Sequence, residues 1–276
     1  MIKDLVVNLA LTAEHDPAAE FALSVASAFT AHAVGIAFQY DPIMPAVLMD
    51  DVPPDVIDME RAENERAANT AASRFDGAAR VASVCSVTRI VESTMAGVAM
   101  RFAHIARRFD LSVVTQARPE SDGPESLIAE QALFDSGRPV LVVPYIQTAP
   151  FKADRVLLCW DGSRTAARAA ADALPFLTRA KAIEIFIVET GKLKSDEIPG
   201  ADIAGHLARH DLNVSVERTV AGDIDVASVI LSHAADVGAD MLVMGGYGHS
   251  RLREFILGGA TRDILKSMTV PTLMSH

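Results

Sequence analysis

Residues Gly245–Thr261 read GGYGHSRLREFILGGAT, and the other predictions build on this stretch. The apolar run Met241–Met244 leads into it, and a helical pattern begins at Thr261. A buried strand that ends in glycines and feeds a helix is typical of a phosphate-binding loop. The glycines let the backbone approach an anion, and the amides at the helix N-terminus point at that anion. No Gly-Lys-Ser/Thr closes the stretch, so it is not a P-loop, and it also lacks the GxGxxG spacing of dinucleotide-binding proteins.

Composition limits the classes of partner. The chain has 276 residues, half of them hydrophobic, which is enough for one large domain or two small ones. Its net charge of -11 argues against nucleic acid or an anionic membrane surface as the main partner. The acidity is uneven, with a charge balance of -9 over residues 1–150 and -2 over residues 151–276. An anionic ligand is therefore better tolerated by the C-terminal half.

The cysteines and the N-terminal residues indicate a cytoplasmic protein. Cys85 and Cys159 stand in apolar, strand-like runs without a CxxC motif or neighbouring histidines, so we expect two buried free thiols rather than a disulfide or a metal site. The apolar run at the N-terminus is too short, and too soon followed by acidic residues, to be a signal peptide. No stretch reaches the roughly 18–20 apolar residues of a membrane span.

The same order of strands and helices occurs twice along the chain. Apolar runs without alternation predict strands covered on both faces, and the intervening helical patterns predict right-handed crossovers between parallel strands. The predicted strands are 3–10, 33–38, 81–91, 111–115 and 139–144, then 156–160, 183–189, 213–220, 241–244 and 270–274. The predicted helices are 17–30, 56–79, 95–109 and 125–134, then 164–177, 198–210, 226–237 and one from 261. We therefore expect two tandem doubly wound α/β domains of five strands each, over residues 1–147 and 153–276, with ligands at the carboxyl ends of the strands.

Two motifs of the second half together resemble the universal stress protein family, in a form with two such domains in tandem. They are Asp161-Gly162-Ser163, after the first predicted strand of that half, and Gly245-x2-Gly248-x9-Gly258, after the fourth. The resemblance implies an adenine nucleotide alpha hydrolase-like fold. It also implies that adenine lies against the first two strands, with ribose and phosphates on the glycine loop and the helix that follows.

The resemblance implies a binding site for ATP, accompanied by Mg2+, and no catalytic or resident metal residues. By motif position, and with Arg251 added as a phosphate contact from the loop, the expected ligand-binding residues are Trp160, Asp161, Val188, Met244, Gly245, Gly248, Arg251, Gly258, Gly259, Ala260 and Thr261. Three of these assignments have simpler alternatives: Asp161 as a helix cap, the glycine stretch as a tight turn, and Arg251 as part of a solvated face or a pair with Glu254. The sequence also departs from the family at Gly259, where Ser or Thr is expected and a hydroxyl contact to phosphate is lost.

The first half departs further from the family pattern. Aligning Asp110 with Asp240 places Thr115 opposite Gly245 and Arg118 opposite Gly248, and the counterpart of Asp161 is about Ala10. The stretch TQARPESDGPES has one glycine and carries three acidic residues that would repel phosphates, Glu120, Asp122 and Glu125. We therefore expect the first half to bind no nucleotide, or to bind a different ligand.

These patterns favour a stress-response or regulatory protein that binds an adenine nucleotide in its C-terminal domain. The alternative is a stress-protein scaffold that binds no nucleotide and acts through protein or small-ligand contacts. We expect that the protein is not an enzyme and hydrolyses ATP at most slowly and incidentally. The chain has no Walker lysine and no evident general base or carboxylate pair for Mg2+. An adenylating enzyme of the wider fold would need a HxGH or PP-loop motif, which is missing. The two domains are expected to pair with each other through residues 139–144 and 270–274, and a homodimer is a further expectation.

Overall fold

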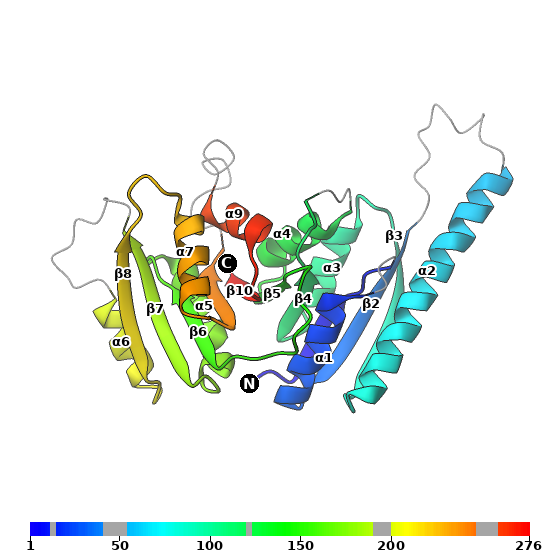
Figure 1. Cartoon of the computed structure of the whole chain (residues 1–276). Helices are drawn as coiled ribbons and strands as arrows, with labels where there is room; N and C mark the ends of the chain where they lie inside the picture. Colours follow the sequence, from blue (N-terminus) through cyan, green and yellow to red (C-terminus); the bar gives the residue numbers. More distant parts are fainter. Residues whose placement is uncertain (12–14, 41–53, 120–122, 190–199, 247–258) are drawn as a thin grey trace. The chain divides into compact units, whose positions relative to one another are not determined.

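A computed structural model describes residues 1–11, 15–40, 54–119, 123–189, 200–246 and 259–276 (Figure 1). These residues form two compact units. The N-terminal unit comprises Met1–Arg138 and Thr148–Phe151, and the C-terminal unit comprises Pro139–Gln147 and Lys152–His276. In the described parts of both units, every helix is too short or too polar to cross a membrane.

The N-terminal unit has a four-stranded parallel sheet in the order β3-β2-β1-β4. Its elements are β1 (Asp4–Asn8), α1 (Pro17–Phe29), β2 (His32–Tyr40), α2 (Pro54–Val81), β3 (Ser86–Ser93), α3 (Val98–Ala106), β4 (Leu111–Thr115) and α4 (Glu125–Asp135). Strand order reverses between β1 and β4, so the switch point of this sheet lies at those two strands.

Capping and apolar spacing explain the two long helices of this unit. Asp16 caps α1 by accepting a hydrogen bond from the amide of Ala19, and Pro17 occupies the first turn, where its missing N–H costs nothing. In α2, only the C-terminal part carries a buried stripe, which includes Ala68, Ala71 and Phe75. The N-terminal part of α2 has no buried side chain among residues 55–63 and extends past the ends of the strands (Figure 1).

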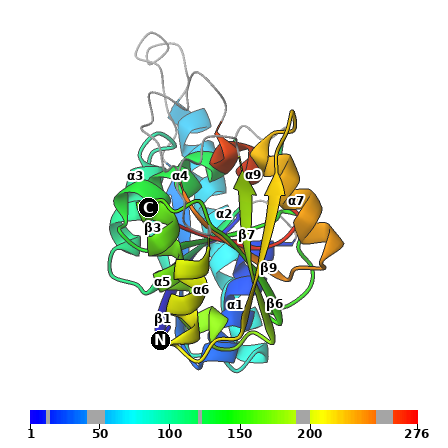
Figure 2. The same ribbon diagram turned by 90° about the vertical axis from the view of Figure 1, so that its left-hand side faces the viewer.

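The C-terminal unit has a six-stranded sheet in the order β5-β10-β9-β6-β7-β8. Its elements are β5 (Val140–Val143), β6 (Arg155–Cys159), α5 (Arg164–Leu177), β7 (Ala182–Glu189), α6 (Ala201–Ala208), β8 (Val214–Val220), α7 (Val226–Asp236), β9 (Met241–Gly245), α9 (Ala260–Ser267) and β10 (Thr272–Ser275). All neighbours are parallel except β5 and β10, which pair antiparallel with Leu141 opposite Leu273. Helices α5 and α6 cover one face and α7 and α9 the other (Figure 2).

Two aspartates have the same role at corresponding places in the two sheets. The carboxylate of Asp110, before β4, accepts the backbone amides of Lys3 and Asp4 at 2.8 and 3.1 Å. The carboxylate of Asp240, before β9, accepts the amide of Arg155 at 2.9 Å and binds the ammonium of Lys152 at 3.0 Å. These contacts support the alignment of the two halves through Asp110 and Asp240.

The order of elements and the α/β class are as predicted, whereas one cysteine and one boundary are not. Cys85 is exposed, because it lies in the turn before the outer strand β3; only Cys159 is the buried thiol that was expected. The strand predicted from Val81 begins at Ser86, since α2 continues to Val81 and the chain then turns through Ser83 at a φ of 55°. The predicted domain boundaries stay a prediction.

Candidate functional site

The carboxyl ends of β6, β7 and β9 meet at one edge of the C-terminal sheet. Register places Leu158 beside Val243 and Cys159 beside Phe186. The amide of Trp160 extends the ladder by donating to the carbonyl of Phe186 at 2.9 Å. Asp161, Val188 and Gly245 therefore follow three strand ends on the same edge, which is where parallel α/β sheets bind ligands.

Gly245 lets the end of β9 lie directly against the first turn of α5. A Cβ at this position would stand 2.5 Å from the amide nitrogen of Ala166 and 2.6 Å from Thr165 Oγ1. These distances are far below any ordinary contact, and one of the atoms is backbone, which cannot move aside like a flexible side chain. Glycine at this position therefore has a steric reason, and it brings the strand end close to a helix N-terminus.

Asp161 and Ser163 form the turn between β6 and α5. Asp161 Oδ1 accepts the amide of Ser163 at 2.9 Å, and Gly162 takes a φ of 73°, which favours glycine. Ser163 Oγ then caps α5 by accepting the amide of Ala166 at 3.1 Å. Ser163, rather than Asp161, is therefore the cap of α5, and Asp161 keeps an exposed carboxylate with further acceptor capacity.

Three other expected residues line this edge with different exposure. Met244 is buried, whereas Trp160 and Val188 are half-buried. Burial raises the pKa of the neighbouring Cys159 thiol to about 12, with a further contribution from the Asp161 carboxylate. That cysteine therefore stays a neutral thiol beneath the edge.

The second helix N-terminus at this edge begins at Gly259. Gly259 is the N-cap of α9 with an extended backbone and no side-chain hydrogen bond, which is the physical consequence of glycine in place of Ser or Thr. Ala260 is half-buried and Thr261 is 4% exposed, so the Thr261 hydroxyl is not on the surface. Gly248, Arg251 and Gly258 lie outside the described residues.

Sequence reasoning missed two polar groups beside Gly245. Thr165 is buried and its Oγ1 lies 3.1 Å from Ser163 Oγ. Ser275 is 1% exposed and stands opposite Gly245 in register, yet its hydroxyl has no hydrogen-bond partner among the described residues. An alternation of buried and exposed positions would not reveal Ser275, because the whole strand β10 is buried.

The corresponding edge of the N-terminal unit is occupied by its own side chains. Ala10 stands where the other unit has Asp161, and its carbonyl accepts a hydrogen bond from Arg74 of α2 at 2.6 Å. Its amide donates at 2.7 Å to Asp16, which is 2% exposed and has the place of Ser163. Burial raises the pKa of Asp16, although two amide hydrogen bonds and Arg74 act in the opposite direction.

The other strand ends of this unit are also unsuited to phosphate. Gln116, after β4, is 2% exposed. Glu125 opens α4 with a carboxylate where the other unit has Ala260 or Thr261 at the start of α9. Burial, together with the charge of Glu125, raises the pKa of Tyr40 to about 12, so Tyr40 keeps its proton at neutral pH.

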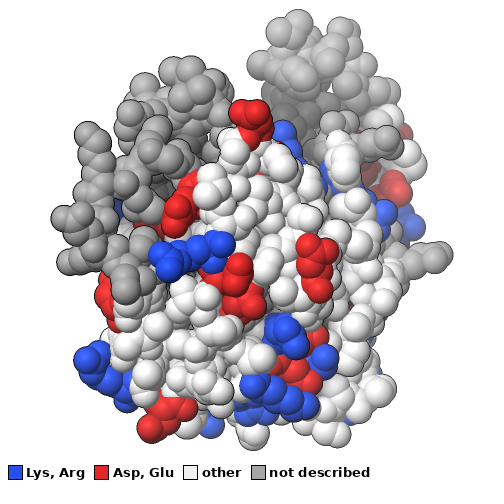
Figure 3. All heavy atoms as spheres, turned by 60° about the vertical axis from the view of Figure 1, so that its left-hand side comes forward, with Lys and Arg blue, Asp and Glu red and all other residues white. Residues whose placement is uncertain are grey.

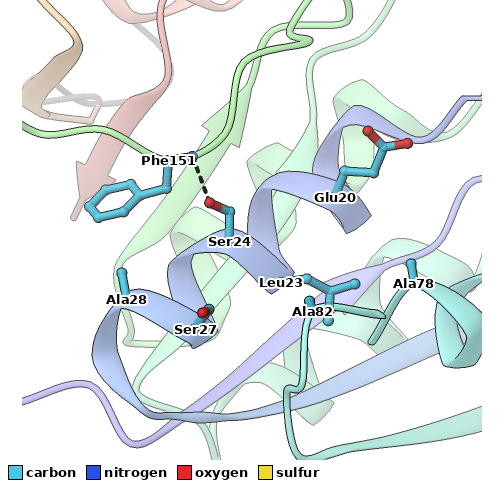
Figure 4. A pocket seen from close by; sticks show the side chains of 8 residues that line it. All are labelled: Glu20, Leu23, Ser24, Ser27, Ala28, Ala78, Ala82 and Phe151. Atoms are coloured by element: carbon cyan, nitrogen blue, oxygen red, sulfur yellow. Dashed lines mark hydrogen bonds between the residues drawn. The ribbon is translucent and has the colours of Figure 1, made fainter. Parts of the chain in front are cut away.

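A hollow of about 500 Å³ lies elsewhere in the N-terminal unit, between α1 and the C-terminal part of α2 (Figure 4). Its lining is Glu20, Leu23, Ser24, Ser27, Ala28, Ala78, Ala82 and Phe151. Phe151 closes one side: its amide donates to Ser24 Oγ at 2.8 Å and its ring packs on Phe21 and Phe29. Because both helices end near the starts of strands, this hollow lies away from the carboxyl edge.

Charged side chains give no sign of a nucleic-acid surface on the face shown in Figure 3. Among the described residues of that face, Lys and Arg alternate with Asp and Glu and large areas are uncharged. This distribution agrees with the net charge of -11.

The fold and the edge together define an α/β protein with a glycine-lined strand-to-helix site. The model of the universal stress protein family matches residues 152–276. This match lies in the C-terminal part of the chain, which contains the candidate site. Universal stress protein Slr1230 of Synechocystis sp. is 28% identical over 151 residues, which are 52% of this chain and 49% of that protein. The match thus spans about half the length of this relative.

Solved structures extend the likeness of fold to the whole chain. A universal stress protein from Archaeoglobus fulgidus DSM 4304 is 14% identical with a TM-score of 0.68, covering 99% of this chain and 95% of its own. A functionally unknown protein from Pseudomonas aeruginosa PAO1 is also 14% identical, with a TM-score of 0.63, and covers 99% and 92%. At these identities the likeness concerns the fold alone.

Proposed function

We propose that the C-terminal unit binds one adenine nucleotide, ATP or a close relative, at the carboxyl edge formed by β6, β7 and β9. The close approach of Gly245 to α5 is the observation that carries this proposal. It forms a cradle that any side chain would fill, and it lies on the same edge as Asp161. The N-terminal unit has Thr115 at the place of Gly245 and Ala10 at that of Asp161.

Asp161, Trp160 and Val188 would hold the adenine. The exposed Asp161 carboxylate offers an acceptor for an exocyclic amine, while the two half-buried apolar side chains supply surface for a flat ring. Met244 and Gly245 would lie beside the ribose. The side chains of Asp161, Trp160 and Val188 are exposed or half-buried at this edge, which supports their assignment to the adenine.

The phosphates would lie between the N-termini of α5 and α9. Helix N-termini favour anions through their amides and their dipoles, and this requires no side chain. Gly259, Ala260 and Thr261 supply backbone amides there, and Gly248, Arg251 and Gly258 complete the proposed set. Mg2+ would accompany the phosphates, with its remaining positions taken by water.

The nucleotide would serve as a regulatory ligand in a stress response, in a cytoplasmic protein. Any hydrolysis of the bound nucleotide would be slow because of the residue types at this edge of the sheet. Asp161 is engaged in a turn, Ser163 caps a helix, and the Cys159 thiol is buried with a raised pKa. None of these three is placed as an activated base or nucleophile.

Gly259 favours a second candidate, a universal stress protein scaffold without nucleotide. A hydrogen bond to a charged phosphate is worth about 1.5–3 kcal/mol, so loss of the expected hydroxyl lowers affinity roughly 10- to 150-fold. In that case pairing through residues 139–144 and 270–274, within the chain or in a homodimer, would present the functional surface. The antiparallel register of β5 with β10 is compatible with such pairing.

Release of bound ligand separates the two candidates. The purified protein is denatured and its supernatant analysed by anion-exchange chromatography, and ATP is then titrated into wild type and Gly248→Val by calorimetry. Released adenine nucleotide, or titratable binding weakened by the valine, supports the first candidate. If the protein releases no nucleotide and binds none, only the scaffold candidate remains. If Gly248→Val binds ATP as tightly as wild type, the loop is not part of the nucleotide site.

A further inference from the structure

We propose that His206 and His210 form a binding site for a transition-metal ion on the exposed surface of α6. The ligands would be one imidazole nitrogen from each residue, completed by water. The site belongs to the class that takes Cu2+, Ni2+ or Zn2+, since imidazole suits these ions, whereas Mg2+ and Ca2+ prefer oxygen. It is separate from the proposed nucleotide site and independent of it.

Helical spacing brings the two rings to one face. Residues four apart are neighbours on a helix surface. The chain keeps a turn conformation past the end of α6, because the amides of Arg209 and His210 donate to the carbonyls of His206 and Leu207. On the other side of the helix, Ile203 and Leu207 are buried against the sheet, so α6 is fixed in orientation with both histidines exposed.

The separation of the rings matches that of two ligands of one ion. The ring centroids are 4.9 Å apart with an angle of 69° between the ring planes. For a metal at about 2.1 Å from one nitrogen of each ring and in line with both ring centroids, the distance to each centroid is roughly 3.2 Å, and centroids 4.9 Å apart subtend about 100° at the metal. That angle falls between the square-planar and tetrahedral values that Cu2+, Ni2+ and Zn2+ adopt.

Both imidazoles are also uncommitted, which distinguishes them from most other histidines of the described residues. His15 contacts Glu20, His32 contacts Asp4, and His233 contacts Glu184. His276 binds the carbonyl of Gly246. Within the described part of the chain, the only side-chain interaction of His206 and His210 is with each other. Their nitrogens are therefore available without breaking a protein hydrogen bond.

The remaining coordination positions would be open to solvent. No group of three or more His, Cys, Asp or Glu side chains lies close enough to share an ion among the described residues. Asp202 stands one turn before His206, but its Oδ1 accepts the amide of Ile203 at 2.7 Å. A two-imidazole site of this kind binds through the proximity of its ligands: holding the second close to the first raises affinity by at least about tenfold.

Titration with Ni2+ tests the site. The full-length protein is titrated by calorimetry in a non-chelating buffer at about pH 7.5, where metal competes well with protons. We expect one ion per chain, and we expect His206→Ala and His210→Ala each to weaken its binding by at least about tenfold. His104→Ala removes an exposed histidine of α3 and should leave this binding unchanged. If either single variant binds as tightly as wild type, the proposal is wrong.

A register control separates chelation from the number of histidines. The double variant Ala208→His/His210→Ala keeps every histidine in the count but moves the second ring around the helix, and it should bind as weakly as His210→Ala alone. Restored affinity would mean that histidine content, not geometry, determines binding. In a Cys85→Ser background, the spin-resonance spectrum of bound Cu2+ should show two nitrogen ligands in the protein and one in either alanine variant. Circular dichroism of each variant checks that the fold is unchanged.

Discussion

Gly245→Ala is the substitution that addresses the candidate site most directly. The added methyl group would meet the amide nitrogen of Ala166 at 2.5 Å, and the carbonyl carbon and Oγ1 of Thr165 at 2.6 Å each. Real Cβ contacts essentially never fall below 3.0 Å. The end of β9 and the first turn of α5 must therefore move apart by several tenths of an ångström, and two of the three atoms are backbone.

Overpacking of this kind typically costs about 1–3 kcal/mol, and we expect the C-terminal unit to lose that much stability. Trp160 is the only tryptophan of the chain and stands at this edge, so its fluorescence in urea follows the unit concerned. ATP affinity should fall as well, since the cradle is widened. Unchanged stability together with unchanged affinity would refute the assignment of Gly245 as the point of close approach.

Gly205→Ala is the matched control. It lies inside α6, where a Cβ would have only Arg209 Nη1 within 4 Å, at 3.8 Å. Alanine is favoured over glycine inside a helix by about 0.5–1 kcal/mol, so this variant should be stabilised and should bind ATP like wild type. Destabilisation by both alanines would indicate a general intolerance rather than a specific contact.

Three further predictions concern the cap of α9, the thiols and acid. Gly259→Ser should raise ATP affinity about tenfold by restoring a hydroxyl to the phosphate side, measured by calorimetry, while changing unfolding free energy by only a few tenths of a kcal/mol. Lower affinity would remove Gly259 from the phosphate site. In native protein, Ellman's reagent should modify the exposed Cys85 quickly and Cys159 only after denaturation, because burial raises the Cys159 pKa to about 12. Two fast thiols would contradict this. The side-chain and backbone hydrogen bonds of Ser228 hold the pKa of Asp225 below its ordinary value of 3.8. The carboxylate therefore stabilises the fold above that pH and loses this effect as pH falls below it, so Asp225→Asn should flatten the decline of the urea midpoint in acid. An equally steep decline in the variant would be the contrary result.

Much of the fold follows from local signals in the sequence. Asp16 before Pro17 and Ser163 before Arg164 specify helix starts through their own hydrogen bonds, and the structure has both. Apolar runs such as Leu111–Thr115 predict buried parallel strands because both faces are covered. Cys85 was misjudged because an apolar run does not reveal that the residue lies in the turn before β3, the outer strand of the sheet, where side chains stay exposed.

The candidate site depends on contacts between residues far apart in the chain, and these were harder to predict. The glycine pattern indicated a cradle, but nothing local to Gly245 indicates that it touches Thr165 and Ala166. Likewise, the sequence predicted that the two halves differ at Ala10. It did not predict the hydrogen bond from Arg74 to the Ala10 carbonyl, because the residue spacing of α2 reveals only which of its side chains are buried.

The number of nucleotides bound per chain tests the central claim. ATP is titrated by calorimetry into the full-length protein freed of any bound ligand, and into Asp161→Ala. The account predicts one ATP per chain, with binding weakened in the variant because the adenine loses its acceptor. Two ATP per chain would contradict the occupied edge of the N-terminal unit, and no binding at all would contradict the proposed site at Asp161 and Gly245.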